Sequence, residues 1–283
     1  MPVLFTVLLP VHRSPDLLPS AIEAVLAQTI ADFELFVICD GAPEETAACA
    51  QRYAAADARV RVFPFPKGER FGEAHRHIAL GEASGRYVAH IADDDLWMPN
   101  HLEEVAELLE DADFGNMLHV SVLPHGQLWL LPCDLSQPAL RERMLREKFN
   151  RFGLSFGCYR LDAYRRLPVG WSPAPDSMWT DLHMWRKFLR RDDMRFATRM
   201  AVTALCFLSS YRAGLSLEGR AAEHRMWHRR IQQEPERRRI VEAAWRSVIS
   251  DQVNEVQTLM RSRSWRYTAP LRWISSQSRK SRG

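Results

Sequence analysis

The stretch "LFTVLLPVHRSPDLLPSAIEAVL", residues 4–26, joins two segments of different hydrophobic period. Residues 4–10 form a continuous apolar run, which is typical of a strand buried on both faces of a sheet. Leu17, Leu18 and Ile22 then recur at the spacing of a helix. Because a strand, a loop and a helix in this order are the repeating unit of α/β proteins, the stretch predicts an α/β fold with a largely parallel sheet.

The same alternation continues over the first part of the chain. We expect strands at residues 33–39, 60–65 and 87–92, and helices at residues 44–56, 72–83 and 100–109. Asn100 and Glu103 match a capping box at the start of the last of these helices. Beyond residue 110 the pattern weakens. There we expect a hairpin made by residues 114–123 and 127–131, and helices at residues 140–149 and 181–190.

The composition is that of an ordinary globular protein. The chain has 283 residues, of which 46% are hydrophobic, enough for one large core or one core and a smaller lobe. Its five cysteines form no C-x-x-C pair, which argues against a disulfide framework or a structural zinc site and favours a reducing, cytoplasmic setting. No apolar stretch approaches the roughly 18 residues of a membrane-spanning helix, and the apolar start reads as a strand rather than a secretory signal.

Three adjacent carboxylates stand in "HIADDDLWMP", residues 90–99. Asp93, Asp94 and Asp95 repel one another, and no basic residue lies near them in the chain. Oxygen ligands of this kind suit Mg²⁺ or Mn²⁺, which is commonly held by one or two carboxylates together with substrate phosphates. A solvated acidic turn before a helix is the alternative interpretation.

Asp40 also follows an apolar strand, directly before Gly41. In an open α/β sheet, ligands bind outside the carboxyl ends of the strands. We therefore expect Asp40 and the acidic triplet to face one crevice. A carboxylate at this place can accept the imide N–H of uracil or thymine, although an ordinary Asp-Gly turn would give the same pattern.

Two segments in this order carry a family resemblance: "FTVLLPVHRSPDLLPSAIEAVLAQTIADFELFVICDG", residues 5–41, and "RHIALGEASGRYVAHIADDDLWMPNHLE", residues 76–103. They resemble the inverting family 2 glycosyltransferases, which belong to the nucleotide-diphospho-sugar transferase superfamily. The resemblance covers about the first 110 residues. It implies the GT-A fold, a Rossmann-like, mixed but mainly parallel sheet flanked by helices, here followed by a C-terminal helical extension.

The resemblance also implies roles for single residues. Asp40 would bind the base of the donor nucleotide, Asp93 would lie near the ribose and the metal, and Asp94 would be a direct metal ligand. The remaining assignments are Asp95 as a second metal ligand, Pro10 and His12 as walls of the nucleotide pocket, and Arg76 as a residue facing the donor. The chain departs from the family pattern at Ala92, where many members have an aspartate, and at His75 and His77 beside Arg76. The metal-binding pair is therefore either Asp93 with Asp94 or Asp93 with Asp95.

A catalytic base is expected in "SMWTDLHMWRKF", residues 177–188. An inverting transfer is a direct displacement, so a carboxylate must take the proton of the attacking hydroxyl. Asp181 lies where the resemblance places the acceptor-side catalytic aspartate. Trp179 and Trp185 flank it with flat apolar faces suited to sugar rings, and Trp185 is expected on the same helical face as Asp181. The alternative is that Thr180 or Asp181 caps the helix and the tryptophans belong to the core.

The chain divides into a predicted transferase domain and an extension. Residues 1–112 would form the nucleotide-binding half and residues 113–218 the acceptor-binding half of one GT-A domain. Residues 219–283 would form a helical extension with a basic tail, because no acidic residue follows Glu255. Such a tail suits peripheral contact with the anionic inner face of a membrane, or else a disordered, solubilising end. The basic residues are Arg261, Arg263, Arg266, Arg272, Arg279, Lys280 and Arg282.

We therefore predict an inverting, Mg²⁺- or Mn²⁺-dependent transferase. Its donor would be a nucleotide-diphosphate sugar, most simply a UDP-sugar, and its acceptor a glycan or a lipid-linked glycan. A catalytically degenerate GT-A domain acting as a scaffold is one alternative. A sugar-nucleotide pyrophosphorylase is another, but it needs a glycine-rich basic loop where this chain has "PVHRSPDLLP", residues 10–19. Nucleic acid is not an expected partner, because the basic residues gather in a tail and not on a folded face.

Overall fold

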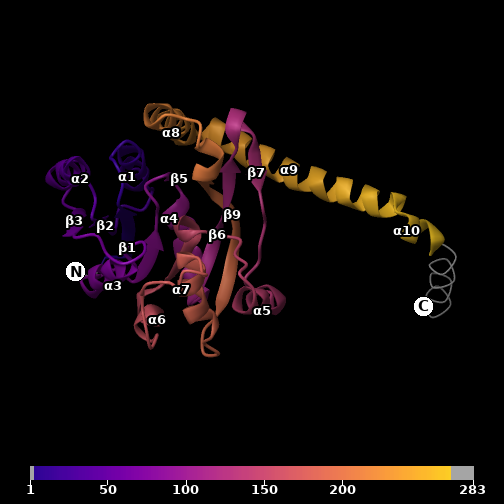
Figure 1. Cartoon of the computed structure of the whole chain (residues 1–283), viewed down its shortest axis with the longest axis horizontal. Helices are drawn as coiled ribbons and strands as arrows, with labels where there is room; N and C mark the ends of the chain where they lie inside the picture. The colour runs from indigo at the N-terminus through magenta and orange to yellow at the C-terminus, as the bar shows by residue number, and fades with distance from the viewer. Residues whose placement is uncertain (1–2, 269–283) are drawn as a thin grey trace.

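The computed structural model describes residues 3–268, and within them one mixed sheet organises the molecule. The order of its strands is β3-β2-β1-β4-β8-β6-β9-β5, with β7 paired to β6. Helices pack on the sheet, as Figure 1 shows. The fold is thus the predicted α/β arrangement of a mainly parallel sheet flanked by helices.

The first half of the sheet is parallel and follows the sequence prediction closely. Strand β1 pairs with β2 and β4, and β2 pairs with β3, all in parallel. The carboxyl ends of these four strands therefore all lie at the same edge of the sheet. The elements are β1 (Phe5–Val11), α1 (Leu18–Leu26), β2 (Phe33–Asp40), α2 (Glu44–Ala56), β3 (Val60–Phe65), α3 (Glu73–Gly81) and β4 (Tyr87–His90).

The second half is mixed. Strand β8 is antiparallel to β4 and β6, whereas β9 runs parallel to β6 and antiparallel to β5. The expected hairpin is present, with β6 and β7 paired antiparallel. The elements are β5 (Asp95–Trp97), α4 (His101–Asp111), β6 (Phe114–Val122), η1 (Pro124–Gly126), β7 (Leu128–Leu130), α5 (Pro138–Arg146), η2 (Leu154–Phe156), β8 (Gly157–Arg160), α6 (Leu161–Arg165), α7 (Thr180–Leu189), β9 (Phe196–Cys206) and η3 (Ser209–Arg212).

One detail of the predicted helix start is wrong. Asn100 is the residue before α4, but its side chain makes no capping hydrogen bond. Glu103 does not return to the helix start either, because its Oε2 accepts a hydrogen bond from Thr29 Oγ1 at 3.3 Å. Tertiary contact with the loop after α1 thus takes the place of the local capping box.

The C-terminal helices begin on the sheet and end away from it. They are α8 (Leu217–Gln232), α9 (Glu234–Arg261) and α10 (Arg263–Tyr267). Trp227 and Ile231 of α8 and Ile240 of α9 are buried in a second core with residues of β6 and β9. Beyond that contact α9 runs out from the body as a single long helix (Figure 1). Within residues 3–268 no helix is long and apolar enough to cross a membrane.

Candidate functional site

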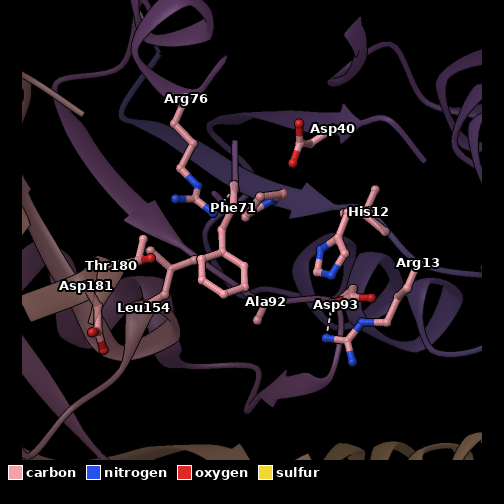
Figure 2. A pocket seen from close by; sticks show the side chains of 12 residues that line it. His12, Arg13, Asp40, Phe71, Arg76, Ala92, Asp93, Leu154, Thr180 and Asp181 are labelled. Carbon is pink, nitrogen blue, oxygen red and sulfur yellow. Dashed lines mark hydrogen bonds and ion pairs between the residues drawn. The ribbon is translucent and has the colours of Figure 1, made fainter. Parts of the chain in front are cut away.

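A pocket of about 270 Å³ opens at the carboxyl ends of β1, β2 and β4. Figure 2 shows that residues from both halves of the sheet face it, with Asp40, His12 and Arg13 on one side and Asp181 and Leu154 on the other. The parallel strands and α7 therefore bring together most of the residues predicted from sequence. The lining residues are Pro10, Val11, His12, Arg13, Asp40, Phe71, Arg76, Ala92, Asp93, Leu154, Thr180 and Asp181.

Asp40 is buried at the end of β2 and is already engaged by the following loop. Its Oδ2 accepts a hydrogen bond from Lys67 Nζ at 2.5 Å, and its Oδ1 accepts one from the Gly68 N–H at 2.6 Å. Burial acts to raise the pKa of Asp40, but the bonds from Lys67 and Gly68 outweigh it and the pKa is lowered. Asp40 is therefore ionised, and a base that pairs with it must share or replace these donors.

Gly72 allows the backbone to approach the Asp40 carboxylate closely. It precedes α3 with φ +68°, a conformation that favours glycine. A Cβ built on Gly72 would lie 2.5 Å from Asp40 Cγ. The glycine is thus required both by the backbone and by the position of Asp40.

The three aspartates of the triplet have three different surroundings. Asp93 Oδ1 accepts a hydrogen bond from Arg13 Nη2 at 2.7 Å, while its buried Oδ2 has no partner among residues 3–268. Asp94 Oδ2 lies 3.0 Å from the same Arg13 nitrogen and 3.8 Å from Arg220 Nη2. The sequence prediction missed both arginines, since only the fold brings them to the triplet. The place of Arg13, just after β1 at the same edge of the sheet, was the available signal.

Asp95 does not reach the pocket, contrary to its predicted role as a metal ligand. It begins β5 and is buried, with Oδ2 accepting from Ser155 Oγ at 2.5 Å and Oδ1 accepting from the Phe207 N–H at 3.2 Å. Burial raises the pKa of Asp95 to about 7, and the neighbouring Asp94 charge acts in the same direction. Both oxygens thus serve the contact between β5, η2 and the end of β9.

The remaining two aspartates fit part of a divalent-metal site. The partnerless Asp93 Oδ2 and the carboxylate of Asp94 are hard oxygen donors. Mg²⁺ is usually held by one or two carboxylates and substrate phosphates, so two donors suffice if a diphosphate supplies others. In the part of the chain that the structure describes, no group of three His, Cys, Asp or Glu side chains is placed to hold an ion. Burial raises the pKa of Asp93 to about 6, against the effect of Arg13.

Asp181 lies across the pocket, in the first turn of α7. Its Oδ2 accepts from Asn150 Nδ2 at 3.0 Å, and its Oδ1 accepts from the Leu182 N–H at 2.7 Å. Burial raises the pKa of Asp181 to about 6, in the range that suits a general base near neutrality. Trp179 is the N-cap residue and its side chain makes no capping bond, so Asp181 is not the N-cap, although it satisfies the first-turn N–H of Leu182. Thr180 Oγ1 instead donates to Glu73 Oε1 at 2.8 Å.

Arg76 is a buried cation between the two walls. Its Nη2 donates to the Phe71 carbonyl at 3.0 Å, whereas Nε and Nη1 find no partner within residues 3–268. Burial lowers the pKa of Arg76 to about 10, so the group stays charged at neutral pH. Figure 2 shows the guanidinium turned toward Phe71, and its buried Nε and Nη1 nitrogens remain unpaired among the described residues.

The two tryptophans predicted to contact the acceptor differ in their exposure to solvent. Trp179 is 47% exposed beside the pocket, with Lys148 Nζ 5.3 Å from its ring centre. Trp185 is fully buried and packs on Phe114, Phe152 and Trp171. The expectation that Trp185 contacts an acceptor is therefore not met, because its face of α7 points into the core.

Pro10 and His12 line the pocket, and the pKa of His12 is lowered by burial and by the charges of Arg13 and Lys67. His75 and His77, at which the chain departs from the family pattern, have different partners. The His75 ring stacks on Phe65 at 4.3 Å, with Nδ1 3.1 Å from Asp40 Oδ1. His77 Nδ1 lies 2.7 Å from Tyr164 Oη.

Residues 6–155, just over half of the chain, match the family model described as "Glycosyl transferase family 2". Among curated relatives, the chain is 30% identical over 102 residues to the Escherichia coli "UDP-Glc:alpha-D-GlcNAc-diphosphoundecaprenol beta-1,3-glucosyltransferase WfgD", covering 35% of this chain and 38% of that protein. It is 33% identical over 102 residues to the "Succinoglycan biosynthesis protein ExoW" of Rhizobium meliloti, covering 34% and 31%. The chain thus spans well under half the length of these relatives.

Solved structures share the fold at low identity. The Staphylococcus aureus protein TarS, solved with UDP-GlcNAc, superposes with a TM-score of 0.57 at 14% identity, covering 72% of this chain and 58% of that one. The mannosyltransferase PcManGT of Pyrobaculum calidifontis, solved with GDP-Man and Mn²⁺, gives a TM-score of 0.52 at 17% identity, covering 98% and 85%. These likenesses extend the fold assignment over most of the chain.

Proposed function

Because the chain belongs to glycosyl transferase family 2, we propose that its pocket binds a nucleotide-diphosphate sugar and transfers the sugar to an acceptor hydroxyl with inversion. The observation that carries this proposal is the meeting of Asp93 and Asp181 in one pocket. One is a partly unpaired carboxylate at the end of the nucleotide-binding strands, and the other is a carboxylate of raised pKa on the opposite wall.

The donor nucleotide would lie over β1 and β2. Asp40 would accept the imide N–H of the base, with Pro10 and His12 as neighbouring walls. We propose a UDP-sugar as the donor, because uracil offers the imide N–H that an ionised carboxylate can accept. Phe71 is half exposed and turned into the pocket (Figure 2), so it adds an apolar face against which a base or sugar can pack.

The diphosphate would lie between the aspartates and Arg76. Asp93 and Asp94 would hold a Mg²⁺ or Mn²⁺ ion, which when bound neutralises the negative charge that develops on the leaving diphosphate. Arg76 would donate hydrogen bonds from its unpaired Nε and Nη1 to an anionic oxygen of the donor. Asp95 takes no part, since its oxygens are held by Ser155 and Phe207.

Asp181 would act as the general base. The acceptor oxygen attacks the anomeric carbon from the Asp181 side, the bond from that carbon to the diphosphate oxygen breaks, and the hydroxyl proton passes to Asp181 Oδ. One displacement inverts the anomeric configuration. Asn150 and the Leu182 N–H hold the carboxylate in place, and the exposed ring of Trp179 offers a flat face to an acceptor sugar.

The acceptor would be a growing envelope polysaccharide or a lipid-linked glycan. The printed names of WfgD and ExoW concern a diphosphoundecaprenol-linked sugar and succinoglycan. We further propose that the protein is cytoplasmic and touches the anionic inner face of the membrane through its C-terminal part. The basic residues from Arg272 onward lie outside the described residues, but α9 carries exposed Ile249, Val253 and Val256 before them.

A non-catalytic scaffold is the second candidate. The observation that favours it is the engagement of Asp40 by Lys67 and of Asp93 by Arg13, which must be released or shared before a donor can bind. The pyrophosphorylase alternative has less support, because the loop after β1 lacks the glycine-rich sequence that such enzymes need.

Product analysis decides between these functions. The protein would be incubated with a panel of UDP-, GDP- and dTDP-sugars and lipid-linked acceptors, with and without Mn²⁺. We expect nucleotide release and an inverted product, seen by NMR, with one UDP-sugar and Mn²⁺. Release of sugar 1-phosphate on addition of pyrophosphate would instead identify a pyrophosphorylase, and no turnover with any donor, together with stable donor binding, would identify a scaffold.

A further inference from the structure

Arg13 and Arg220 hold the acidic pair from two sides. Arg13 Nη2 lies 2.7 Å from Asp93 Oδ1 and 3.0 Å from Asp94 Oδ2, and Arg220 Nη2 lies 3.8 Å from the same Asp94 oxygen. Figure 2 shows the contact between Arg13 and Asp93 at the edge of the pocket. The Asp93, Arg220 and Asp94 side chains are 3%, 12% and 16% exposed and that of Arg13 is 29% exposed, so these charges meet partly shielded from water.

The two arginines reach this place from opposite ends of the chain. Arg13 follows β1, whereas Arg220 lies in the first turn of α8, outside the residues matched by the family model. Ser209 Oγ receives a hydrogen bond from Arg220 Nη2 at 3.1 Å and lies 3.1 Å from Asp94 Oδ2, which ties α8 to the acidic loop. Helix α8 therefore contacts the acidic loop next to the pocket, although its residues are not among those that line the pocket.

Both guanidinium groups retain unused donors. The Nε atoms of Arg13 and Arg220 are buried and have no hydrogen-bond partner among the residues that the structure describes. A guanidinium presents five N–H donors in a fork that fits two phosphate oxygens at once. Each arginine can therefore take on a diphosphate oxygen with groups that the free protein leaves unpaired.

The charges at this place favour one set of partners for the two arginines in the free protein and another when a donor is bound. In the free protein two guanidinium groups offset the two carboxylates of Asp93 and Asp94. A sugar nucleotide brings two negative charges on its diphosphate, and a divalent ion offsets them. Without the arginines the carboxylates, the ion and the diphosphate together would keep a net negative charge in a partly buried place, which is costly.

We infer that Arg13 and Arg220 bind the diphosphate in addition to Arg76, and that they are paired with Asp93 and Asp94 in the free protein and turn to the diphosphate when a donor binds. This inference rests on the proposed function for the identity of the ligand. It has one direct consequence. A divalent ion alone competes with the guanidinium groups for the carboxylates, whereas an ion that arrives with a diphosphate does not. Metal and diphosphate therefore bind with positive coupling.

Binding measurements on Arg13→Gln and Arg220→Gln test this inference without turnover. Mn²⁺ alone would be titrated by electron paramagnetic resonance, and pyrophosphate and UDP by calorimetry, each with and without Mn²⁺. We expect Arg13→Gln to bind Mn²⁺ alone about 5-fold more tightly or better, and to bind pyrophosphate and UDP about 10-fold more weakly. Arg220→Gln should change both affinities in the same directions by smaller factors, because its contact with Asp94 is longer.

Two variants separate this result from general damage. Arg59→Gln removes the same charge from a pair with Asp57 after α2, away from the pocket, and should leave both affinities unchanged. Arg13→Lys keeps a point charge and should lie between the wild type and Arg13→Gln. Mn²⁺ and pyrophosphate affinities that stay at the wild-type values, or fall together, in both Gln variants would overturn the inference. Binding of pyrophosphate but of no nucleotide by the wild type would instead contradict the proposed function and leave the inference standing.

Discussion

At the scale of single residues, neighbouring identical side chains differ in what they can do. Asp93 has one unpaired oxygen, and Asp94 lies between Arg13 and Arg220. Asp95 is buried and accepts a hydrogen bond from Ser155. The sequence predicts an acidic loop, but the direction of each carboxylate depends on β5 pairing with β9, a contact between distant segments. That is why the sequence left the metal-binding pair open, and why only the position of Arg13 after the first strand pointed to either arginine.

Asp181 should set the pH dependence of turnover. Burial penalises its charged form, so its pKa is raised to about 6 and the base is lost as pH falls through that value. With donor and metal saturating, we expect kcat to fall about tenfold per pH unit below pH 6. The pH–rate profile of kcat would be compared with that of Asp181→Asn, which should be roughly 10²–10⁴-fold slower and lack this limb. If kcat of Asp181→Asn still fell below pH 6, a group other than Asp181 would be responsible for the pH dependence.

Gly72 should be intolerant of a side chain. Gly72→Ala combines positive φ with a Cβ only 2.5 Å from Asp40 Cγ, and we expect it to lose about 1–3 kcal/mol of unfolding free energy and to weaken UDP binding. Gly81→Ala is the matched control in the same helix, because its Cβ meets nothing within 4 Å. It should be neutral or stabilise by up to about 1 kcal/mol. Equal urea midpoints for the two variants would show that Gly72 carries no such constraint.

At the scale of elements, α7 joins the core to the pocket. Its buried face carries Trp185, against which Gly157 packs so closely that a Cβ there would lie 2.6 Å from the ring. Its first turn presents Asp181, and Thr180 ties it to Glu73 of α3. Sequence spacing located this helix to within one residue, but it placed Trp185 beside an acceptor on the same face as Asp181, because the position of the sheet cannot be read from a helical repeat.

The two tryptophans should therefore respond differently to truncation. Trp185→Ala empties a fully buried site, and we expect a loss of about 3–5 kcal/mol in unfolding free energy. Trp179→Ala changes a half-exposed ring, so its stability should stay within about 0.5 kcal/mol of the wild type while KM for the acceptor rises. Chemical denaturation and acceptor saturation curves measure these effects. A stable Trp185→Ala variant with a raised acceptor KM would restore the role first predicted for Trp185.

At the scale of the whole molecule, the first half of the fold is predictable and the second is not. Strands β1 to β4 are short apolar runs that alternate with helical segments, so their positions and parallel direction follow from the sequence pattern. Strands β8 and β9 were not expected, since β9 mixes exposed and buried residues and bulges where it pairs with β6. The predicted boundary near residue 218 falls at the start of α8. The division into two halves and an extension remains a prediction.

The outer part of α9 should add an apolar face to the membrane contact proposed for the C-terminal part. Ile249, Val253, Val256 and Met260 are each about half exposed and recur every three or four residues, so they lie on one face of the helix. We expect the full chain to float with vesicles containing phosphatidylglycerol, and the variant with Val253→Ser and Val256→Ser to float less, with unchanged UDP affinity. The change Thr258→Ser on the polar side serves as the control. Equal flotation of the wild type, the double variant and the control would show that this face of α9 does not contact the membrane.

The proposed function depends most on the different roles of the acidic pair, Asp93 and Asp94, and of Asp181. Calorimetric titration of Asp94→Ala and Asp181→Ala with UDP, in the presence and absence of Mn²⁺, measures these roles directly and is read beside turnover. We predict that Asp94→Ala loses the Mn²⁺-dependent part of UDP affinity, whereas Asp181→Ala binds UDP as the wild type does and loses turnover by roughly 10²-fold or more. Normal Mn²⁺-dependent UDP binding by Asp94→Ala, with the loss found in Asp181→Ala, would contradict it.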